Sequence, residues 1–186
     1  VLYADDCNVF FPLDHSNASN TEINNSLSKL SDWFACNELA LNVTKTNYMI
    51  FGGRRRITID GIAINGAQLN RVSQTNFLGI LVDDKLSWKA HIQATSRKLS
   101  KSLWVLRKVK HNFSRAIMMQ LYNSFVLPYL QYGITLWGAA YKTSLEPLFV
   151  LQKKALKITL NLPIRTNSNF LFTENKILSI FGLFKL

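Results

Sequence analysis

The spacing of apolar residues changes near residue 86, and this change predicts two kinds of structure. Before it, the apolar residues form short runs, such as residues 1–3 and 77–82, separated by polar residues and glycines. Short runs of this kind are typical of strands joined by tight turns. After it, apolar residues recur every three or four positions, which is the period of an amphipathic helix. We therefore predict an α+β chain, with hairpins and one packed helix in residues 1–85 and helices in residues 86–186.

One helix is predicted in the first part of the chain. Ser19 and Glu22 have the spacing of a capping box, so we expect the helix to begin near Thr21. Asn37 is predicted to end it. The apolar residues of its buried side recur at intervals of four, three and four, at Ile23, Leu27, Leu30 and Phe34.

Strands account for the other apolar runs of this part. They are predicted at residues 1–3, 9–11, 39–43, 48–51, 57–59, 62–64 and 77–82. Asp60-Gly61 lies between two of these runs and is typical of a hairpin turn. The run at 77–82 is nearly continuous and predicts one buried strand. Within it, Gly79 indicates a bulge or a close approach of another backbone.

A long basic amphipathic helix is predicted from residue 86 onward. Its apolar face consists of Trp88, Ile92, Thr95, Leu99, Leu103, Leu106 and Val109. Basic residues occupy much of its remaining surface, namely Lys89, Arg97, Lys98, Lys101, Arg107, Lys108 and Lys110.

Three more helices are predicted after it. Ser114 is suited to cap the first, and Pro128 forces a bend in the chain that follows. The apolar stripe of that helix consists of Ile117, Leu121 and Phe125. Ser144 is predicted to cap the second helix, which Pro163 ends, and the third is expected over residues 173–186.

Residues 116–141 carry no charge over 26 positions, a length that can cross a bilayer. Polar residues and a proline, however, fall through the middle of this segment, and helical spacing persists in its first half. A buried helical hairpin is therefore favoured over a membrane span, and no membrane is expected among the partners.

Charge divides the chain at about the same place as the hydrophobic pattern. The net charge is +11 and the isoelectric point is about 9.8. Residues 1–84 have a balance of −3, whereas residues 85–186 have a balance of +14. This asymmetry predicts a polymer of phosphates as the partner of the second part, although solubility alone also explains a basic surface.

The two cysteines, Cys7 and Cys36, have neither zinc-site spacing nor a disulfide pattern, which favours an intracellular, reducing location. The chain opens at Val1 inside an apparent strand, without an initiator methionine or a signal peptide. We therefore expect it to be a fragment of a longer protein.

Asp5 and Asp6 are the candidate metal ligands. They are predicted to lie at the tip of the first hairpin, where a tight turn can present carboxylates to a divalent cation. An ordinary solvated turn is the alternative. Arg54, Arg55 and Arg56 are interpreted as a solvated loop rather than a phosphate site.

Several motifs occur in an order that resembles the reverse transcriptases of non-LTR (LINE, jockey-like) retrotransposons. They are Tyr3-Ala4-Asp5-Asp6, Lys45-Thr46, Phe77-Leu78-Gly79, residues 83–88 with His91-Ile92, residues 127–133 with Leu136-Trp137-Gly138, and residues 151–155. The resemblance implies the C-terminal part of a polymerase palm in residues 1–85. It implies a helical thumb and post-thumb region, truncated, in residues 86–186.

The resemblance also implies roles for individual residues. Asp5 and Asp6 would be catalytic and bind two Mg²⁺ ions, which activate a primer 3′-hydroxyl and stabilise the departing pyrophosphate. Tyr3, Ala4 and Lys45 would bind the incoming nucleotide, with an ordinary surface lysine as the alternative for the last. Phe77, Leu78 and Gly79 match the primer grip, although core packing explains the first two equally well. The residues expected on the nucleic-acid backbone are Lys89, Arg97, Lys98, Lys101, Arg107 and Lys108. Trp88 and His91 are interpreted as packing residues.

The function implied is RNA-directed DNA polymerisation, with an RNA template, a DNA primer and deoxynucleoside triphosphates as partners. The parent element would act in the nucleus and cytoplasm. Because the third carboxylate of the family's metal site lies on an earlier strand, we expect the isolated chain to be inactive. A non-catalytic nucleic-acid-binding remnant of a decayed or domesticated element is the alternative.

Overall fold

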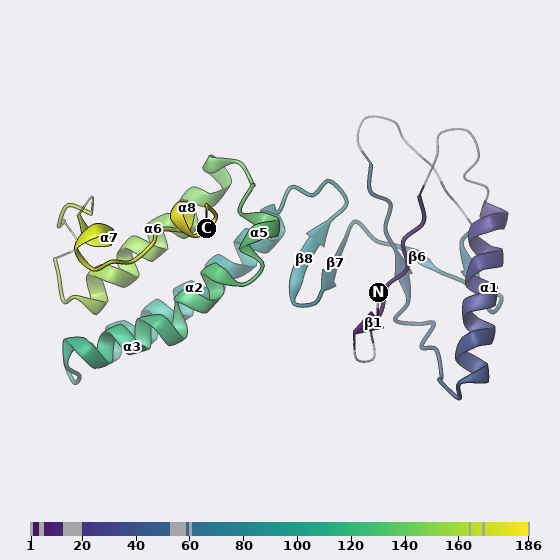
Figure 1. Ribbon diagram of the computed structural model, residues 1–186, viewed down its shortest axis with the longest axis horizontal. Coiled ribbons are helices and arrows are strands. Elements are labelled where there is room, and N and C mark those ends of the chain that lie inside the picture. The colour runs from purple at the N-terminus through teal and green to yellow at the C-terminus, as the bar shows by residue number, and fades with distance from the viewer. Residues whose placement is uncertain are drawn as a thin grey trace. The chain divides into compact units, whose positions relative to one another are not determined.

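The computed structural model describes residues 2–3, 6–12, 20–52, 59, 61–163, 165–168 and 170–185. The chain forms two compact units, Val1–Gln74 and Thr75–Leu186. Figure 1 shows the first with one long helix and short strands, and the second with several helices. This mixture of helices and small sheets agrees with the predicted α+β class.

The described part of the first unit contains one helix, α1 (Asn20–Cys36), and six short strands. The strands are β1 (Leu2–Tyr3), β2 (Asp6–Cys7), β3 (Asn47–Tyr48), β4 (Ala63–Ile64), β5 (Ala67–Gln68) and β6 (Asn70–Arg71). They pair as β1 with β2 and β4 with β5, both antiparallel, and as β3 with β6, which is parallel.

Helix α1 confirms the predicted helix and packs against β4. Its buried residues include Leu27 and Phe34, which belong to the predicted apolar side. The side chain of Asn24 joins the helix to the start of β4, because it donates to the carbonyl of Gly61 at 2.9 Å and accepts from the N–H of Ala63 at 3.0 Å. The apolar core beneath consists of Leu27, Ile50, Ile59, Ile62, Ile64 and Leu69.

Several predicted strands of this unit are wrong. Residues 39–43 form no strand, because Asn42 organises a turn in which its carbonyl accepts from the N–H groups of Lys45 and Thr46. The strand predicted at 48–51 is limited to β3. The hairpin turn lies at Asn65-Gly66, where both residues have positive φ, 51° and 74°. Two such residues are the requirement of a type I′ turn. Of the hairpin predicted at Asp60-Gly61, residues 57, 58 and 60 lie outside the described residues.

The first hairpin is confirmed, but its second strand begins earlier than predicted. Tyr3 pairs with Asp6 and Leu2 with Cys7. Residues 9–11 are not a strand, and Val9 and Phe10 are exposed. Asp6 is therefore a strand residue rather than a residue of the turn.

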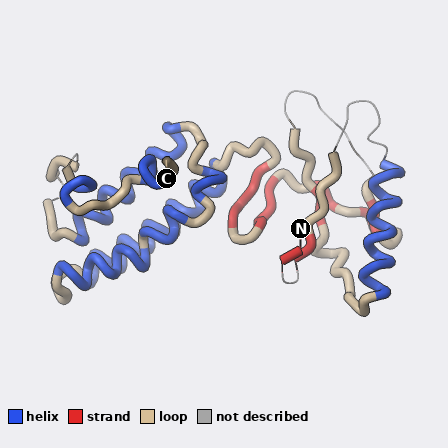
Figure 2. Tube along the Cα trace, viewed as in Figure 1, coloured by secondary structure: helices blue, strands red, loops and turns tan. Residues whose placement is uncertain are grey.

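The second unit begins inside β7 (Gln74–Phe77), which forms a hairpin with β8 (Ile80–Asp83), and helices follow, as the blue segments of Figure 2 show. The helices are α2 (Lys89–Val109), α3 (Arg115–Phe125), α4 (Leu127–Gln131), α5 (Ile134–Trp137), α6 (Lys142–Thr159), α7 (Leu171–Glu174) and α8 (Ile180–Leu183). The single strand predicted at 77–82 is wrong, because the chain turns at Leu78-Gly79. Both residues have positive φ, 48° and 79°, which again suits a two-residue hairpin.

Helix α2 is confirmed and forms the core of this unit together with α3 and α6. Leu99 and Leu106 are fully buried on its predicted apolar face. Opposite them lie Leu148 and Leu156 of α6, also fully buried. Each fully buried leucine stabilises the fold by roughly 1.5–3 kcal/mol relative to an exposed one.

The faces and starts of the other helices differ in part from the predictions. Ser114 caps α3, accepting from the N–H of Ile117, and the chain breaks before Pro128 as expected. The predicted stripe of α3 is wrong, because Met118 and Tyr122 are buried, whereas Ile117 and Phe125 are 41% and 45% exposed. Helix α6 begins two residues before Ser144, without a side-chain cap.

The single helix predicted over residues 173–186 is also wrong, because the chain forms two short helices here, α7 and α8, with a non-helical connection between them. Gln152 of α6 holds the start of α8 in place. Its amide donates to the carbonyl of Leu178 at 3.0 Å and to the Tyr122 hydroxyl at 3.2 Å, and its carbonyl accepts from the N–H of Ile180 at 2.9 Å. The nitrogen and the oxygen of this buried amide are thus both paired inside the core, as burial requires.

None of the described helices is both long and apolar enough to cross a membrane.

Candidate nucleic-acid interface

The turn at Leu78-Gly79 rests on the segment between α4 and α5. The Tyr132 hydroxyl donates to the carbonyl of Leu78 at 2.5 Å. A Cβ added at Gly79 would meet the same tyrosine ring at 3.6 Å. Tyr132 is itself fixed, because its carbonyl accepts from the indole N–H of Trp137 at 2.8 Å. The turn predicted to be part of a primer grip is therefore positioned by a residue 54 positions away.

Gly133 permits this close packing. It has a φ of +64°, and an added Cβ would clash with Cδ1 of Ile80 in β8. A residue with a side chain would be strained by the backbone and blocked by the strand. The hairpin and the α4–α5 segment can thus approach only because this position has no side chain.

His91 supports β8 from α2. The N–H of Leu81 donates to its Nδ1 at 3.2 Å, and its Nε2 lies 3.5 Å from the Thr95 hydroxyl. The ring is 5.6 Å from that of Trp137. Burial, together with the charge of Lys98, lowers the pKa of His91 from its usual value. A neutral ring with an unprotonated Nδ1 is what the bond from Leu81 requires. His91 is therefore a packing residue, as predicted, and it also positions β8.

Asp83 organises the loop that joins β8 to α2. Its Oδ1 accepts from the N–H groups of Lys85 at 3.2 Å and Ser87 at 3.0 Å. Its Oδ2 accepts from the N–H of Trp88 at 2.9 Å and from the Ser87 hydroxyl at 3.3 Å. Trp88 occupies the N-cap position of α2, with φ of 61°, but its side chain makes no capping hydrogen bond. The carboxylate of Asp83 takes this capping role instead. This role was missed in the sequence, where the only signal was an acidic residue shortly before the basic helix.

Three of the motifs that carry the resemblance therefore meet in one place. Phe77-Leu78-Gly79 forms the turn, residues 83–92 form the loop and the start of α2, and residues 127–133 and 136–138 form the support beneath them. Phe77 and Leu78 are partly buried, and Gly79 is exposed. These hydrogen bonds hold a partly exposed turn next to the strand that contacts the first turn of the basic helix.

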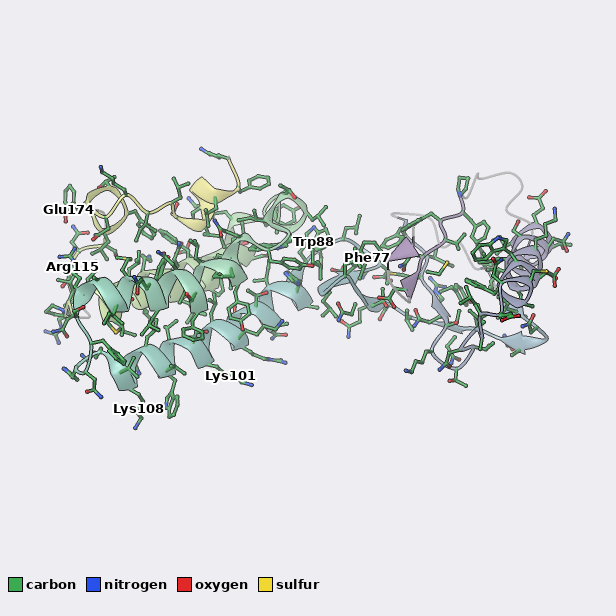
Figure 3. All side chains as sticks on the ribbon, turned by 60° about the horizontal axis from the view of Figure 1, so that its bottom comes forward. Phe77, Trp88, Lys101, Lys108, Arg115 and Glu174 are labelled. Carbon is green, nitrogen blue, oxygen red and sulfur yellow. The ribbon has the colours of Figure 1, made fainter. Side chains whose placement is uncertain are left out.

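Helix α2 presents its predicted basic residues to solvent. Lys89, Arg97, Lys98, Lys101, Arg107 and Lys108 are all exposed. The helix contains no acidic residue. Two of the lysines lie over aromatic rings, Lys98 Nζ at 5.8 Å from the ring centre of Tyr129 and Lys108 Nζ at 5.6 Å from that of Trp104. Figure 3 shows Lys101 and Lys108 on the same side of α2. A surface of this kind is suited to bind phosphates.

The other predicted site residues lie in the first unit. Asp6 is exposed in β2, and Lys45 is exposed in the turn that Asn42 organises. Ala4, Asp5 and the side chain of Tyr3 lie outside the described residues. Among the described residues, no three His, Cys, Asp or Glu side chains come together as metal ligands could.

Comparison with known proteins identifies similar sequences over most of the chain. A probable RNA-directed DNA polymerase from transposon BS of Drosophila melanogaster is 27% identical over 166 residues, which is 87% of this chain. The RNA-directed DNA polymerases from mobile element jockey of Drosophila melanogaster and of Drosophila funebris are each 26% identical over 83% of it. The resemblance to the reverse transcriptases of non-LTR retrotransposons is confirmed.

The chain spans only 17–18% of the length of these reverse transcriptases. No protein-family model matches it, and no solved structure matches it significantly.

The Mg²⁺ ions of a reverse transcriptase fit the described residues only in part. The carboxylate of Asp6 offers the oxygen ligands that Mg²⁺ prefers. One described carboxylate is not a site, however, and the described residues contain no group of three or more His, Cys, Asp or Glu side chains that could hold the ion. The metal assignment of Asp5 and Asp6 therefore stays a prediction.

Proposed function

We propose that this chain is part of an RNA-directed DNA polymerase of a non-LTR retrotransposon. In this proposal residues 1–85 belong to the C-terminal part of the palm, and residues 86–186 form the thumb and the region after it. The observation that carries the proposal is the hairpin at Leu78-Gly79: Tyr132 holds its turn, and His91 holds its second strand, β8, against the first turn of the basic helix α2.

The second unit contributes the surface for template and primer. The turn of Phe77, Leu78 and Gly79 orients the primer end, because Tyr132 holds the carbonyl of Leu78 and His91 holds the N–H of Leu81 in the adjoining strand β8. The exposed cations of α2 hold the sugar-phosphate backbone without reading the base sequence. Charge supports this division, since residues 85–186 have a balance of +14.

The first unit contributes the chemistry. Asp5 and Asp6 supply carboxylate oxygens for Mg²⁺, and Tyr3, Ala4 and Lys45 bind the incoming deoxynucleoside triphosphate. Bound Mg²⁺ neutralises the charge that develops on the transferred phosphate. A two-metal site of this kind needs a further carboxylate ligand besides Asp5 and Asp6. The chain spans less than a fifth of the length of its relatives. The isolated 186-residue chain is therefore expected to bind nucleic acid without extending a primer.

Primer extension by a chimera tests the proposal. We would join this chain to the amino-terminal palm and fingers of a jockey polymerase and measure DNA synthesis on an RNA template. Asp5→Ala and Asp6→Ala should each abolish extension, because a two-metal site loses a ligand. Asp32→Ala removes an exposed carboxylate of α1 and should leave the rate unchanged.

Two results would contradict the proposal. A chimera that extends no primer, when the intact jockey polymerase does so under the same conditions, argues against the polymerase assignment. Extension that survives both aspartate substitutions shows that the metal assignment is wrong.

A further inference from the structure

Trp104 lies exposed in the middle of the basic surface of α2. Its side chain is 62% exposed, although tryptophan is normally buried for most of its surface. Arg97, Lys101 and Lys108 precede and follow it at helical spacings, and all three are exposed. Because residues three, four and seven positions apart share one side of a helix, these four residues form a single outward stripe. Figure 3 shows two of the four, Lys101 and Lys108, on the same side of α2.

We propose that Trp104 stacks on an unpaired base, so that this outward stripe of α2 binds single-stranded nucleic acid in preference to a fully paired duplex. The inference rests on the proposed function, because it takes phosphate binding by α2 as given and adds the kind of strand that is bound.

Charge identifies the occupant as a polyanion. The helix has no acidic residue, and the ammonium group of Lys108 lies 5.6 Å from the centre of the Trp104 ring. An apolar protein surface would leave these cations without counter-charges. Nucleic acid supplies phosphates for the cations and a flat ring for the tryptophan, and stacking of this kind contributes roughly 1–3 kcal/mol per base.

The spacing along the helix suits a strand with an accessible base. Lys101 lies three residues before Trp104 and Lys108 lies four residues after it. The stripe from Arg97 to Lys108 is about 16 Å long at 1.5 Å per residue. Phosphates on both sides of one base can therefore meet cations while the base itself meets the ring. In a duplex every base is already stacked on its neighbours, so the ring gains no partner there.

An anionic membrane surface is a poorer match. Membrane-surface helices bury a broad apolar face in the lipid. The apolar face of α2 is instead used inside the protein, where Leu99 and Leu106 are fully buried. On the outward stripe and its margin, only Trp104 and Val105 are large apolar side chains, and Val105 is 39% exposed.

Binding by the full 186-residue chain tests the inference. The probes are a labelled, unstructured RNA of about 16 nucleotides, the upper site size of a single-strand-binding domain, and the same RNA annealed to its complement. Binding is followed by fluorescence anisotropy at several salt concentrations. Trp104→Ala should weaken binding of the single strand by roughly 5- to 150-fold, the equivalent of one stacked base. It should change binding of the duplex by less than about twofold, because no base is free to stack there. Trp104→Phe keeps a smaller ring and should recover part of the loss.

Trp33→Ala is the matched control. Trp33 is also exposed, at 47%, but lies on α1 among residues that do not form a basic stripe. Its replacement should leave both affinities unchanged. Tryptophan fluorescence gives a second readout, since a stacked base quenches the ring: the single strand should quench the wild type and Trp33→Phe, but not Trp104→Phe. Far-ultraviolet circular dichroism checks that each variant is folded.

The outcomes separate the inference from the proposed function. If Trp104→Ala weakens the binding of both RNAs equally, or of neither, the stacking proposal is overturned. Loss of RNA binding in a Lys101→Gln, Lys108→Gln double variant would still support the phosphate-binding surface. If the wild type binds neither RNA, both proposals fail. Binding to phosphatidylserine vesicles with a blue shift of Trp104, without RNA binding, would overturn the inference in favour of a lipid surface.

Discussion

The replacement of Asp83 by asparagine tests whether this carboxylate holds the loop before α2. The loop contains two non-glycine residues with positive φ, Leu86 at 50° and Trp88 at 61°. Such residues are strained by roughly 1–3 kcal/mol each and persist only where neighbouring contacts hold them. Here the four hydrogen bonds to the Asp83 carboxylate provide that hold.

The loss of stability expected for Asp83→Asn can be estimated from these hydrogen bonds. Asparagine keeps the shape and one acceptor oxygen, but it loses the charge and the second acceptor. A hydrogen bond to a charged group contributes about 1.5–3 kcal/mol, and partial exposure of the Asp83 carboxylate reduces this. We expect Asp83→Asn to lower the free energy of unfolding by about 1.5 kcal/mol. Asp84→Asn is the control, because its carboxylate accepts none of these four bonds.

The effect should depend on pH. Partial burial alone would raise the pKa of Asp83, but the bonds from Ser87, Trp88 and Lys85 outweigh it and hold the pKa below its ordinary value of 3.8. The folded state thus favours the ionised carboxylate. Its contribution to stability is complete above pH 3.8 and is lost as the pH falls through the folded pKa.

Urea unfolding of the full chain, followed by circular dichroism at neutral pH and in acid below the folded pKa of Asp83, measures both effects. At neutral pH the wild type should exceed Asp83→Asn in stability, and in acid the two should converge. If Asp84→Asn is equally destabilising, or if the difference persists unchanged in acid, the role assigned to Asp83 is wrong.

Two further predictions concern the packing of the second unit and its core. Gly133→Ala should lower the free energy of unfolding by about 3 kcal/mol, because the alanine would have a strained φ and would also clash with β8. Gly66→Ala is the control: Gly66 has a φ of +74° but open space around it, so this substitution should lower the free energy of unfolding by only about 1 kcal/mol. If urea unfolding shows the same loss of stability for both variants, the clash at Gly133 is contradicted. Burial raises the pKa of Tyr122 to about 12, against the opposing bond from Gln152, so one of the six tyrosines should ionise late in a titration followed by tyrosinate absorbance. Because the folded state holds this proton more strongly, its contribution to stability is full below pH 10 and is lost between pH 10 and about 12. A titration in which Tyr122→Phe removes an early step instead of the late one would refute this.

The long helices could be predicted because one side of each is apolar and the other polar. In α2 the buried positions Leu99, Leu103 and Leu106 alternate with lysine and arginine at the helical period, so only one face can turn inward. In α3, apolar residues occupy both possible sides, and the sequence pattern cannot choose between them. The structure buries Tyr122 because Gln152 of α6 meets its hydroxyl, a contact between residues 30 positions apart.

The candidate site was predictable as a set of motifs but not as an arrangement. The apolar run at 77–82 hides its turn, because Leu78 takes a left-handed φ that leucine rarely adopts. Only the hydroxyl of Tyr132, from a distant segment, shows why that conformation persists. The bonds of Asp83 were equally hidden, since a carboxylate near a helix start can cap the helix or remain in solvent.

The bond between Tyr132 and Leu78 has a consequence for the order in which the chain folds. A two-stranded hairpin such as β7–β8 is marginal in water by itself, and the tyrosine that holds its turn lies 54 residues further along the chain. Closing so long a loop has an entropic cost that is recovered only after α2, α4 and α5 have assembled. We therefore expect the turn to become ordered only after these helices have packed. In hydrogen exchange, its amides should be among the first to open and those of α2 among the last.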